Sequence, residues 1–492
     1  MNDYKAAKEA FVSGMTGSTV SHINLISSVA LVSIALYSTL QTRIYVGREI
    51  PFLQSCVVLV LPLLLSMTLF ANKPVSLCFL LLLPTGFILL RTPWPDTSIP
   101  LHGSAASNLA APKQSSLTPL PALTTYRAHM MFMTILGIFA VDFPVFPRSL
   151  AKCESYGVSL MDLGVGSFVF SNGLVSAIPL LKDPRHLSAP LLPKLWAVVR
   201  KMFPVIALGV VRVLLVKGTE YPEHETEYGT HWNFFITLAL LPILQVLLHP
   251  LIRVVPSSLL GVGVGLLQQI ALSLFGLKHY VRTAPRLNII SANKEGFVSL
   301  AGYLSIHLLG LSTGTLLLPP SPSFFRRLLR QRSTPSELSA PRQNDKTAVE
   351  LVSYAIVWWA LLGFVSLLHV DEGVSRQTAN LAYALWIVAF NTSFILAYLV
   401  LDMMFFPTPA VRKGKPVPTP IDTRASAPAL LEAVNMNGLP LFLLANVGTG
   451  LVNLSMRTMY TGTVAAMSVL TLYVLAFCVV AWRLRRTRVW RL

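Results

Sequence analysis

The sequence predicts an all-α polytopic membrane protein, a bundle of about thirteen transmembrane helices without a soluble domain. Four apolar stretches contain no Lys, Arg, Asp or Glu: Ile23–Leu40, Phe52–Ala71, Pro74–Leu90 and Leu470–Trp482. Most are close to the ~20 residues that a helix needs to cross the hydrocarbon layer of a bilayer. Only 12% of the 492 residues are charged and 53% are hydrophobic, whereas soluble domains carry about 25% charged residues. Because backbone groups in lipid must be satisfied within the segment, these stretches are expected to be helical.

Apolar runs and the charges that flank them place the spans in chain order. The thirteen spans are expected to centre near Val32, Leu61, Leu82, Phe132, Phe168, Leu208, Leu240, Leu266, Ile306, Trp359, Val388, Leu444 and Leu472. Pro, Gly and charge clusters separate them. Three segments rich in Pro, Ser or basic residues, 93–121, 319–346 and 406–428, are expected to be flexible surface loops. We therefore expect residues 1–492 to form a single transmembrane domain.

The charges of the loops predict how the chain is oriented across the membrane. If the spans alternate and the N-terminus is lumenal or exterior, the opposite side holds roughly twice as many Lys and Arg, including the tail Arg483–Arg491. Cations accumulate on the cytoplasmic side of membrane proteins, so the C-terminus is expected to be cytoplasmic. This bias also accounts for the net charge of +18, which therefore does not indicate nucleic acid.

Two loops on the lumenal side contain cations where that rule disfavours them. The first, Asp142–Tyr156, holds Arg148, Lys152 and Glu154, and the second, Lys278–Glu295, holds Arg282, Arg286 and Lys294. One interpretation is that these cations have no function and are among the dozen or so that fall on the disfavoured side. The functional interpretation is an anion-binding or catalytic surface at the lumenal face, where a phospholipid headgroup is an obvious anion.

The first of these loops holds an acid and an amine beside the membrane. Asp142 ends an apolar helix, and Lys152 follows about ten residues later. Ionisable groups beside the hydrocarbon layer tend to form ion pairs or to have a functional role. A carboxylate can accept a hydroxyl proton, and a nearby cation can stabilise a developing negative charge. A structural ion pair is the alternative.

Other polar residues have weaker indications. Asp162 begins a span, where a negative charge complements the helix dipole, and Val165 and Phe168 follow it beside two glycines. The sequence His231-Trp232-Asn233 lies at a span edge and is typical of an interfacial belt. The late residues Asn437, Asn446 and Asn453 either bond between helices or line a polar cavity. No metal-ligand spacing is visible among the Cys and His residues.

From these residues alone, the protein could be either an enzyme or a transporter. Transporters usually carry ionisable groups near the midplane within repeated halves, whereas here the charges crowd at one face and no repeat is evident. This modestly favours an enzyme that acts on a lipid headgroup.

Seven stretches resemble the inositol acyltransferase family of glycosylphosphatidylinositol (GPI) anchor synthesis, whose fungal members are called GPI-anchored wall transfer proteins and whose mammalian member is PIG-W. They are Lys8–Gly14 (KEAFVSG), Val141–Pro147 (VDFPVFP), Ala151–Val175, Glu227–Phe235 (EYGTHWNFF), Asn293–Leu311, Asn391–Pro407 and Asn435–Tyr460. They extend over nearly the whole chain, and the middle ones are long enough to be specific.

The resemblance implies an enzyme of the endoplasmic reticulum membrane with a lumenal N-terminus. It would transfer a palmitoyl-type chain from acyl-CoA, as co-substrate, to the inositol 2-hydroxyl of glucosaminyl-phosphatidylinositol. Asp142 and Lys152 match the family's catalytic pair. No bound cofactor, nucleic acid or obligate protein partner is implied. From the residues, we expect the Gly164–Phe168 face to hold the acyl chain, and Lys278–Lys294 and His231–Asn233 to contact headgroup or CoA phosphate. The alternatives are a lipid or solute transporter and a histidine-dependent membrane-bound O-acyltransferase, for which the candidates are His129, His249 and His307.

Overall fold

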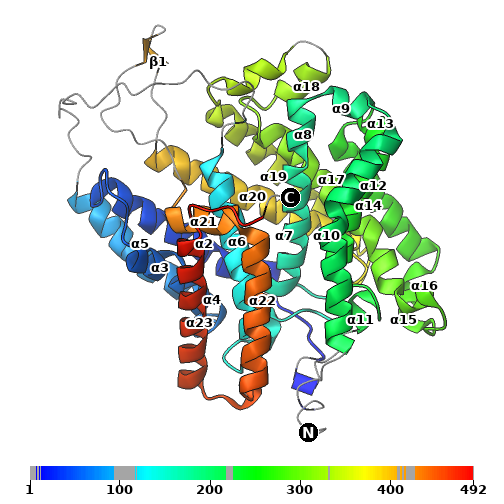
Figure 1. Ribbon diagram of the computed structural model, residues 1–492, viewed down its shortest axis with the longest axis horizontal. Helices are drawn as coiled ribbons and strands as arrows, with labels where there is room; N and C mark the ends of the chain where they lie inside the picture. Colours follow the sequence, from blue (N-terminus) through cyan, green and yellow to red (C-terminus); the bar gives the residue numbers. More distant parts are fainter. Residues whose placement is uncertain are drawn as a thin grey trace. The chain divides into compact units, whose positions relative to one another are not determined.

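The protein is helical nearly throughout the part of the chain that the computed structural model describes, which confirms the predicted fold class (Figure 1). The described residues are 7, 10–11, 13–92, 117, 119–217, 225–330, 333–406, 411–412, 415–416 and 427–490. Within them, the exception is a short antiparallel pair, β1 (Val411–Arg412) and β2 (Lys415–Pro416), with Val411 opposite Pro416.

Nine helical segments in the described part of the chain are long and apolar enough to cross a membrane. They are α2 (Val20–Arg43), α5 (Pro74–Arg91), α7 with α8 (Leu160–Val175 and Ala177–Lys182), α14 (Ser257–Leu274), α17 (Lys294–Leu317), α19 (Asn344–Leu367), α20 (Leu381–Phe405), α22 (Gly438–Ser455) and α23 (Thr463–Arg483). The other four predicted centres also lie in helices, namely α3–α4 (Phe52–Leu59 and Leu61–Met67), α6 (Pro121–Ala140), α10 (Leu191–Lys217) and α12 (Phe234–Leu247). The multi-pass membrane architecture is therefore established.

Short helices fill the connections. They are α9 (Arg185–Ser188), α11 (Glu225–Tyr228), α13 (His249–Ile252), α15 (Leu277–Thr283), α16 (Ile289–Ala292), α18 (Phe324–Leu329) and α21 (Ala429–Met436), with 3-10 turns η1 (Arg148–Leu150), η2 (Pro335–Ser339) and η3 (Thr458–Tyr460). The segment 319–346, predicted as a flexible loop, contains α18 and η2 and buries Phe324 and Leu328. The flexibility of this segment stays a prediction. The predicted loops 93–121 and 406–428 lie largely outside the described residues.

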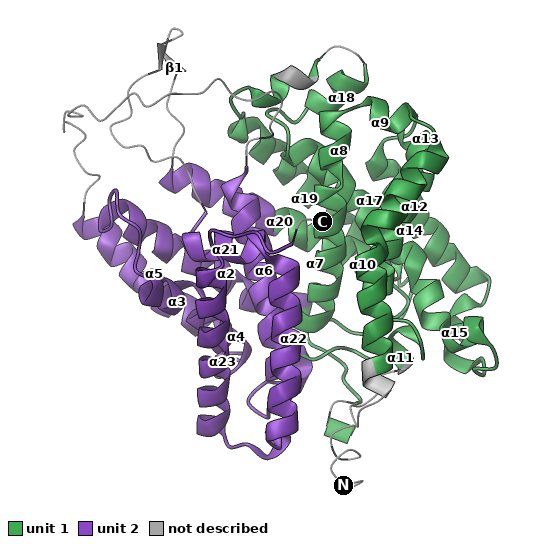
Figure 2. Cartoon of the chain, in the orientation of Figure 1, with its two compact units in different colours: residues 1–19, 151–393, 492 green, residues 20–150, 394–491 purple. Residues whose placement is uncertain are grey.

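The chain forms two compact units (Figure 2). Unit 1 comprises residues 1–19 and 151–393, and unit 2 comprises residues 20–150 and 394–491. Helix α20 begins in unit 1 and ends in unit 2, because the boundary follows Ser393.

Unit 1 is built on α17, which packs backbone to backbone against α7. A methyl group added to Gly173 would lie 2.0 Å from the carbonyl oxygen of His307, and one added to Gly310 would lie 2.2 Å from that of Phe170. Small residues permit this close approach between membrane helices. The contact fixes α7, the helix whose first turn carries Asp162, relative to α17.

Unit 2 packs through aromatic side chains. Phe139 of α6 stacks on Tyr473 of α23 with ring centroids 3.9 Å apart, and Phe132 meets Phe477 edge to face at 5.5 Å. Helices α21 and α22 lie against α6. This packing holds the end of α6, after which Asp142 follows, beside the end of α22.

Candidate functional site

Lys152 in unit 1 is held by one carboxylate. Its ammonium nitrogen lies 2.9 Å from each carboxylate oxygen of Glu227, which belongs to α11. The Lys152 side chain remains 33% exposed and that of Glu227 18%. An ammonium has three N–H donors, so at least one remains for a ligand. Lys152 is therefore oriented and still accessible.

A buried ion pair between Arg376 and Asp162 lies next to Glu227. The Nε of Arg376 lies 2.6 Å from Oδ1 of Asp162, and these side chains are 2% and 0% exposed. A second nitrogen of Arg376 reaches Glu227 at 4.0 Å. Burial disfavours the Arg376 cation, but Glu227 and Asp162 outweigh burial and raise its pKa well above the usual value. Asp162, Arg376, Glu227 and Lys152 thus form one chain of alternating charges.

Asp162 has a role that the sequence only partly indicated. Its Oδ2 accepts hydrogen bonds from the Cys153 amide at 3.0 Å and from the Ser159 hydroxyl at 2.8 Å, while Ser159 caps α7 by accepting from the Asp162 amide. The carboxylate therefore joins the start of α7 to the loop that carries Lys152. Arg376 and Glu227 were missed as site residues. An arginine beside the edge of a span, on the predicted lumenal side, was the available signal for Arg376.

Asp142 in unit 2 is 3% exposed. Its Oδ2 accepts a hydrogen bond of 2.7 Å from the amide of Asn453 near the end of α22, and the Asn453 oxygen accepts one of 3.1 Å from Thr458. Arg148 donates to the carbonyl oxygens of Phe143 and Phe146. Burial lowers the pKa of Arg148 to about 10, and the nearby Asp142 opposes that shift. The sequence marked Asn453 only as one of several asparagines in a late span and did not indicate that it reaches Asp142.

Asp142 and Lys152 belong to different units. Each is held by groups of its own unit: Asp142 by Asn453, and Lys152 by Glu227. Their action as a catalytic pair stays a prediction.

Two cations of the second predicted lumenal loop are paired with acids. Lys278 lies 2.8 Å from both Asp371 and Glu372, and Arg282 lies 3.0 Å from Glu372. Burial opposes the charges of Lys278 and Asp371, but their mutual bond, reinforced by neighbouring groups, raises the pKa of Lys278 and lowers that of Asp371.

The two remaining cations of this loop are also engaged. Arg286 binds Glu295 at 2.7 Å, and Lys294 donates to the carbonyl oxygen of Ala284. These pairs tie the predicted lumenal loops of unit 1 together. Headgroup contact by these cations stays a prediction.

Several other predicted residues have structural contacts. Glu154 accepts from the Gly14 amide at 2.7 Å. Asn233 caps α12 and donates to the Gly209 carbonyl at 2.7 Å. Trp232 donates to Thr237, whereas His231 is exposed.

The structure also shows the burial of the predicted acyl-chain face and the contacts of the late asparagines. Val165 and Phe168 are half-buried on α7. Asn437 holds the C-terminal tail through Leu484, Thr487 and Val489, at the opposite end of α22 from Asn453. The exposed Asn446 donates to Phe442 of its own helix.

The three histidines of the alternative mechanism are buried. His129 is bonded to Tyr398 at 2.8 Å, and His307 to Gln245 at 2.7 Å. His249 is 1% exposed.

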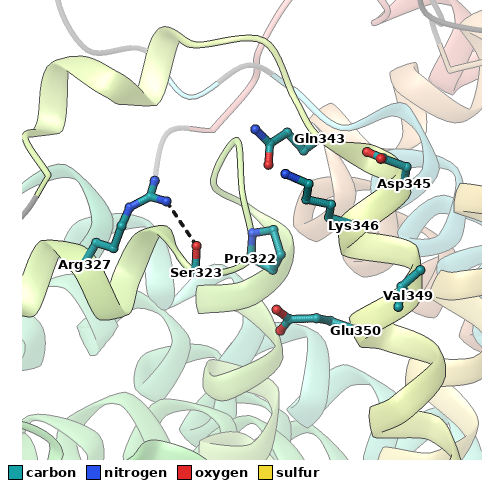
Figure 3. A pocket seen from close by; sticks show the side chains of 8 residues that line it. All are labelled: Pro322, Ser323, Arg327, Gln343, Asp345, Lys346, Val349 and Glu350. Carbon is teal, nitrogen blue, oxygen red and sulfur yellow. Dashed lines mark hydrogen bonds between the residues drawn. The ribbon is translucent and has the colours of Figure 1, made fainter.

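An open hollow of about 480 Å³ lies between α18 and the start of α19, lined by Pro322, Ser323, Arg327, Gln343, Asp345, Lys346, Val349 and Glu350. Figure 3 shows Arg327 bonded to Ser323 at its edge. It lies beyond the end of α17 that is remote from Glu295. It contains none of the predicted site residues and has acids and cations in equal measure.

The chain is similar to known proteins over nearly its whole length. A family model described as GWT1 matches residues 4–484. A GPI-anchored wall transfer protein 1 of Aspergillus oryzae is 40% identical over 510 residues, with 99% of each chain covered. Those of Cryptococcus neoformans var. grubii and Saccharomyces cerevisiae are 37% and 35% identical, each with 99% of this chain covered and with 100% and 99% of their own.

Proposed function

The chain belongs to the GWT1 family, and we propose that it is an inositol acyltransferase of GPI-anchor biosynthesis in the endoplasmic reticulum membrane. The names of its relatives connect it to GPI anchors. The proposed reaction transfers a palmitoyl-type chain from acyl-CoA to the inositol 2-hydroxyl of glucosaminyl-phosphatidylinositol. The N-terminus would be lumenal and the C-terminus cytoplasmic.

The proposed mechanism uses Asp142 as the base. Its carboxylate accepts the inositol hydroxyl proton while the hydroxyl oxygen attacks the thioester carbonyl carbon. The tetrahedral intermediate then breaks its C–S bond, and the departing thiolate takes the proton back from Asp142. The products are the inositol ester and free CoA, so that protons and electrons balance.

Lys152 would stabilise the oxyanion of the intermediate. The observation that carries this assignment is its geometry: the ammonium is held by both oxygens of Glu227 and is still one-third exposed. A preoriented donor costs no reorganisation when charge develops, and this is why such groups contribute strongly to catalysis. Because Glu227 already serves as the ion partner of Lys152 within unit 1, oxyanion donation is a better assignment for Lys152 than charge compensation of Asp142.

Acylation by purified protein tests the proposal. Wild-type protein with labelled acyl-CoA and glucosaminyl-phosphatidylinositol should form an acylated lipid, whereas a transporter would form none. Lys152→Ala and Asp142→Asn should each abolish product formation with unchanged protein yield. The matched control is Arg326→Gln, which removes an exposed cation 3.8 Å from Glu350 and should leave the rate intact. Normal turnover in Lys152→Ala would refute the assignment.

The histidine-dependent alternative makes the opposite prediction. His129→Ala and His307→Ala would then abolish acylation in folded protein, while Asp142→Asn would retain it. The same assay therefore separates the two mechanisms.

A further inference from the structure

A group of cations without a paired acid lies where α9, α10 and α13 meet in unit 1. Lys194, near the start of α10, is 6% exposed and donates to the carbonyl oxygens of His186 and Leu187 at 3.1 and 3.3 Å. The rings of His186 and His249 meet edge to face with centroids 5.6 Å apart. Arg185 and Arg253 are exposed on α9 and at the end of α13. We call Arg185, Lys194, Arg253 and the two histidines the basic corner; its helices α9 and α13 lie together in Figure 1.

The basic corner lacks a matching negative charge. Among the described residues, no carboxylate forms an ion pair with Arg185, Lys194 or Arg253. The acid in the neighbouring turn is the exposed Asp183, whose side chain accepts from the backbone amide of Arg185. The group therefore has three formal cations against one capping carboxylate.

The excess positive charge helps to lower the pKa of both histidines. Both ring nitrogens of His249 are without a hydrogen-bond partner, although the side chain is 1% exposed. Burial, together with the charge of Lys194 and the neighbouring His186, lowers the pKa of His249 to about 4. Burial and Lys194 also lower the pKa of His186, against a weaker opposing effect of Asp183.

A general excess of cytoplasmic cations does not explain this arrangement. That bias concerns exposed loop residues, which are solvated by water. A buried ammonium without a counter-ion and a buried imidazole without hydrogen bonds both cost free energy. An anion with several acceptor oxygens would offset both costs, because phosphate oxygens accept strong hydrogen bonds from Arg and Lys.

We propose that the basic corner binds a phosphate-bearing group, from either the nucleotide part of the acyl-CoA donor or a phospholipid headgroup. The acyl-CoA source rests on the proposed function, whereas the headgroup source does not. Helix α12 begins after its N-cap Asn233, shortly after Glu227, and ends just before His249. The corner therefore lies at the far end of the spans from Lys152, which is the predicted cytoplasmic face, where acyl-CoA is made.

Binding of full-length protein in phosphatidylcholine nanodiscs tests this proposal. The probes are CoA itself, phosphate-free pantetheine, and phosphatidylinositol added to the nanodiscs and detected by native mass spectrometry. The double variant Arg185→Gln, Arg253→Gln changes only exposed side chains and should fold. Loss of these contacts should weaken binding of the correct phosphate ligand about tenfold or more. The control is the double variant Arg326→Gln, Arg330→Gln, which removes the same two charges from exposed side chains on the same predicted face.

The outcomes separate the sources. Weaker CoA binding with unchanged pantetheine and phosphatidylinositol binding identifies the nucleotide phosphates. Reduced phosphatidylinositol retention with unchanged CoA binding identifies a headgroup site. Unchanged binding of both probes overturns the proposal. Lys152→Ala should bind CoA normally while forming no product, so failure of the proposed function would be seen in turnover and failure of the basic corner in binding.

Discussion

Replacement of Asn453 by Leu is the sharpest perturbation of the proposed base. It removes the 2.7 Å hydrogen bond to Asp142, which is 3% exposed. A hydrogen bond to a charged group contributes about 1.5–3 kcal/mol. If this bond orients the carboxylate in the transition state, kcat should fall about 10- to 150-fold, with KM for acyl-CoA little changed. Asn453 would thus be a positioning residue that acts through Asp142.

The measurement is the pH–rate profile of acylation for Asn453→Leu and Asn453→Asp beside wild type. A second carboxylate disfavours ionisation of the first, so Asn453→Asp should move the acidic limb of the profile to higher pH. The matched control is Asn446→Leu on the same helix, because Asn446 is exposed and bonds only to its own turn at Phe442. Wild-type kcat in Asn453→Leu, or equal losses in both Leu variants, would refute the reasoning.

Three further predictions concern unit 1. Arg376→Met should lower the stability of folded protein by about 3–5 kcal/mol, because it leaves a buried carboxylate without its cation; the thermal unfolding temperature in detergent measures this. Acidification should loosen the predicted lumenal loops of unit 1. The bond to Lys278 helps to lower the pKa of Asp371, so the contribution of Asp371 to stability is present above about pH 4 and is lost as pH falls through its lower folded-state pKa. Limited proteolysis from pH 6 to pH 3 reports this loss. Gly173→Ala should destabilise the α7–α17 contact, because its methyl group would lie 2.0 Å from the His307 carbonyl oxygen, and should lower the yield of folded protein.

Each of these has a control and an opposing outcome. Arg326→Gln should keep the wild-type unfolding temperature, and equal stability of Arg376→Met would contradict the buried-pair argument. Lys278→Gln should remove most of the difference between pH 6 and pH 3, and an unaltered difference would assign the acid effect to other groups. Gly363→Ala, where an added methyl group meets nothing within 4 Å, should be tolerated, and equal yields of the two glycine variants would contradict the packing argument.

The sequence by itself determined the membrane architecture. All thirteen predicted centres lie in helices, because long runs without charge have no economical alternative in a bilayer. The same local reasoning found Asp142 and Lys152, since an ionisable group at a span edge is conspicuous in one dimension. It also marked Asp162, although dipole complementation described only part of its role.

Only the tertiary structure decided which groups hold these residues. Asn453 reaches Asp142 from far along the chain, and Arg376 reaches Asp162 in the same way. Neither pair has a local signature, because partners brought together by helix packing carry no fixed spacing in the sequence. Conversely, the cations of Lys278–Glu295 were conspicuous in the sequence, and the structure paired most of them with acids. Charge counts along a chain report the side of the membrane, whereas the counter-ion of each charge depends on the three-dimensional packing.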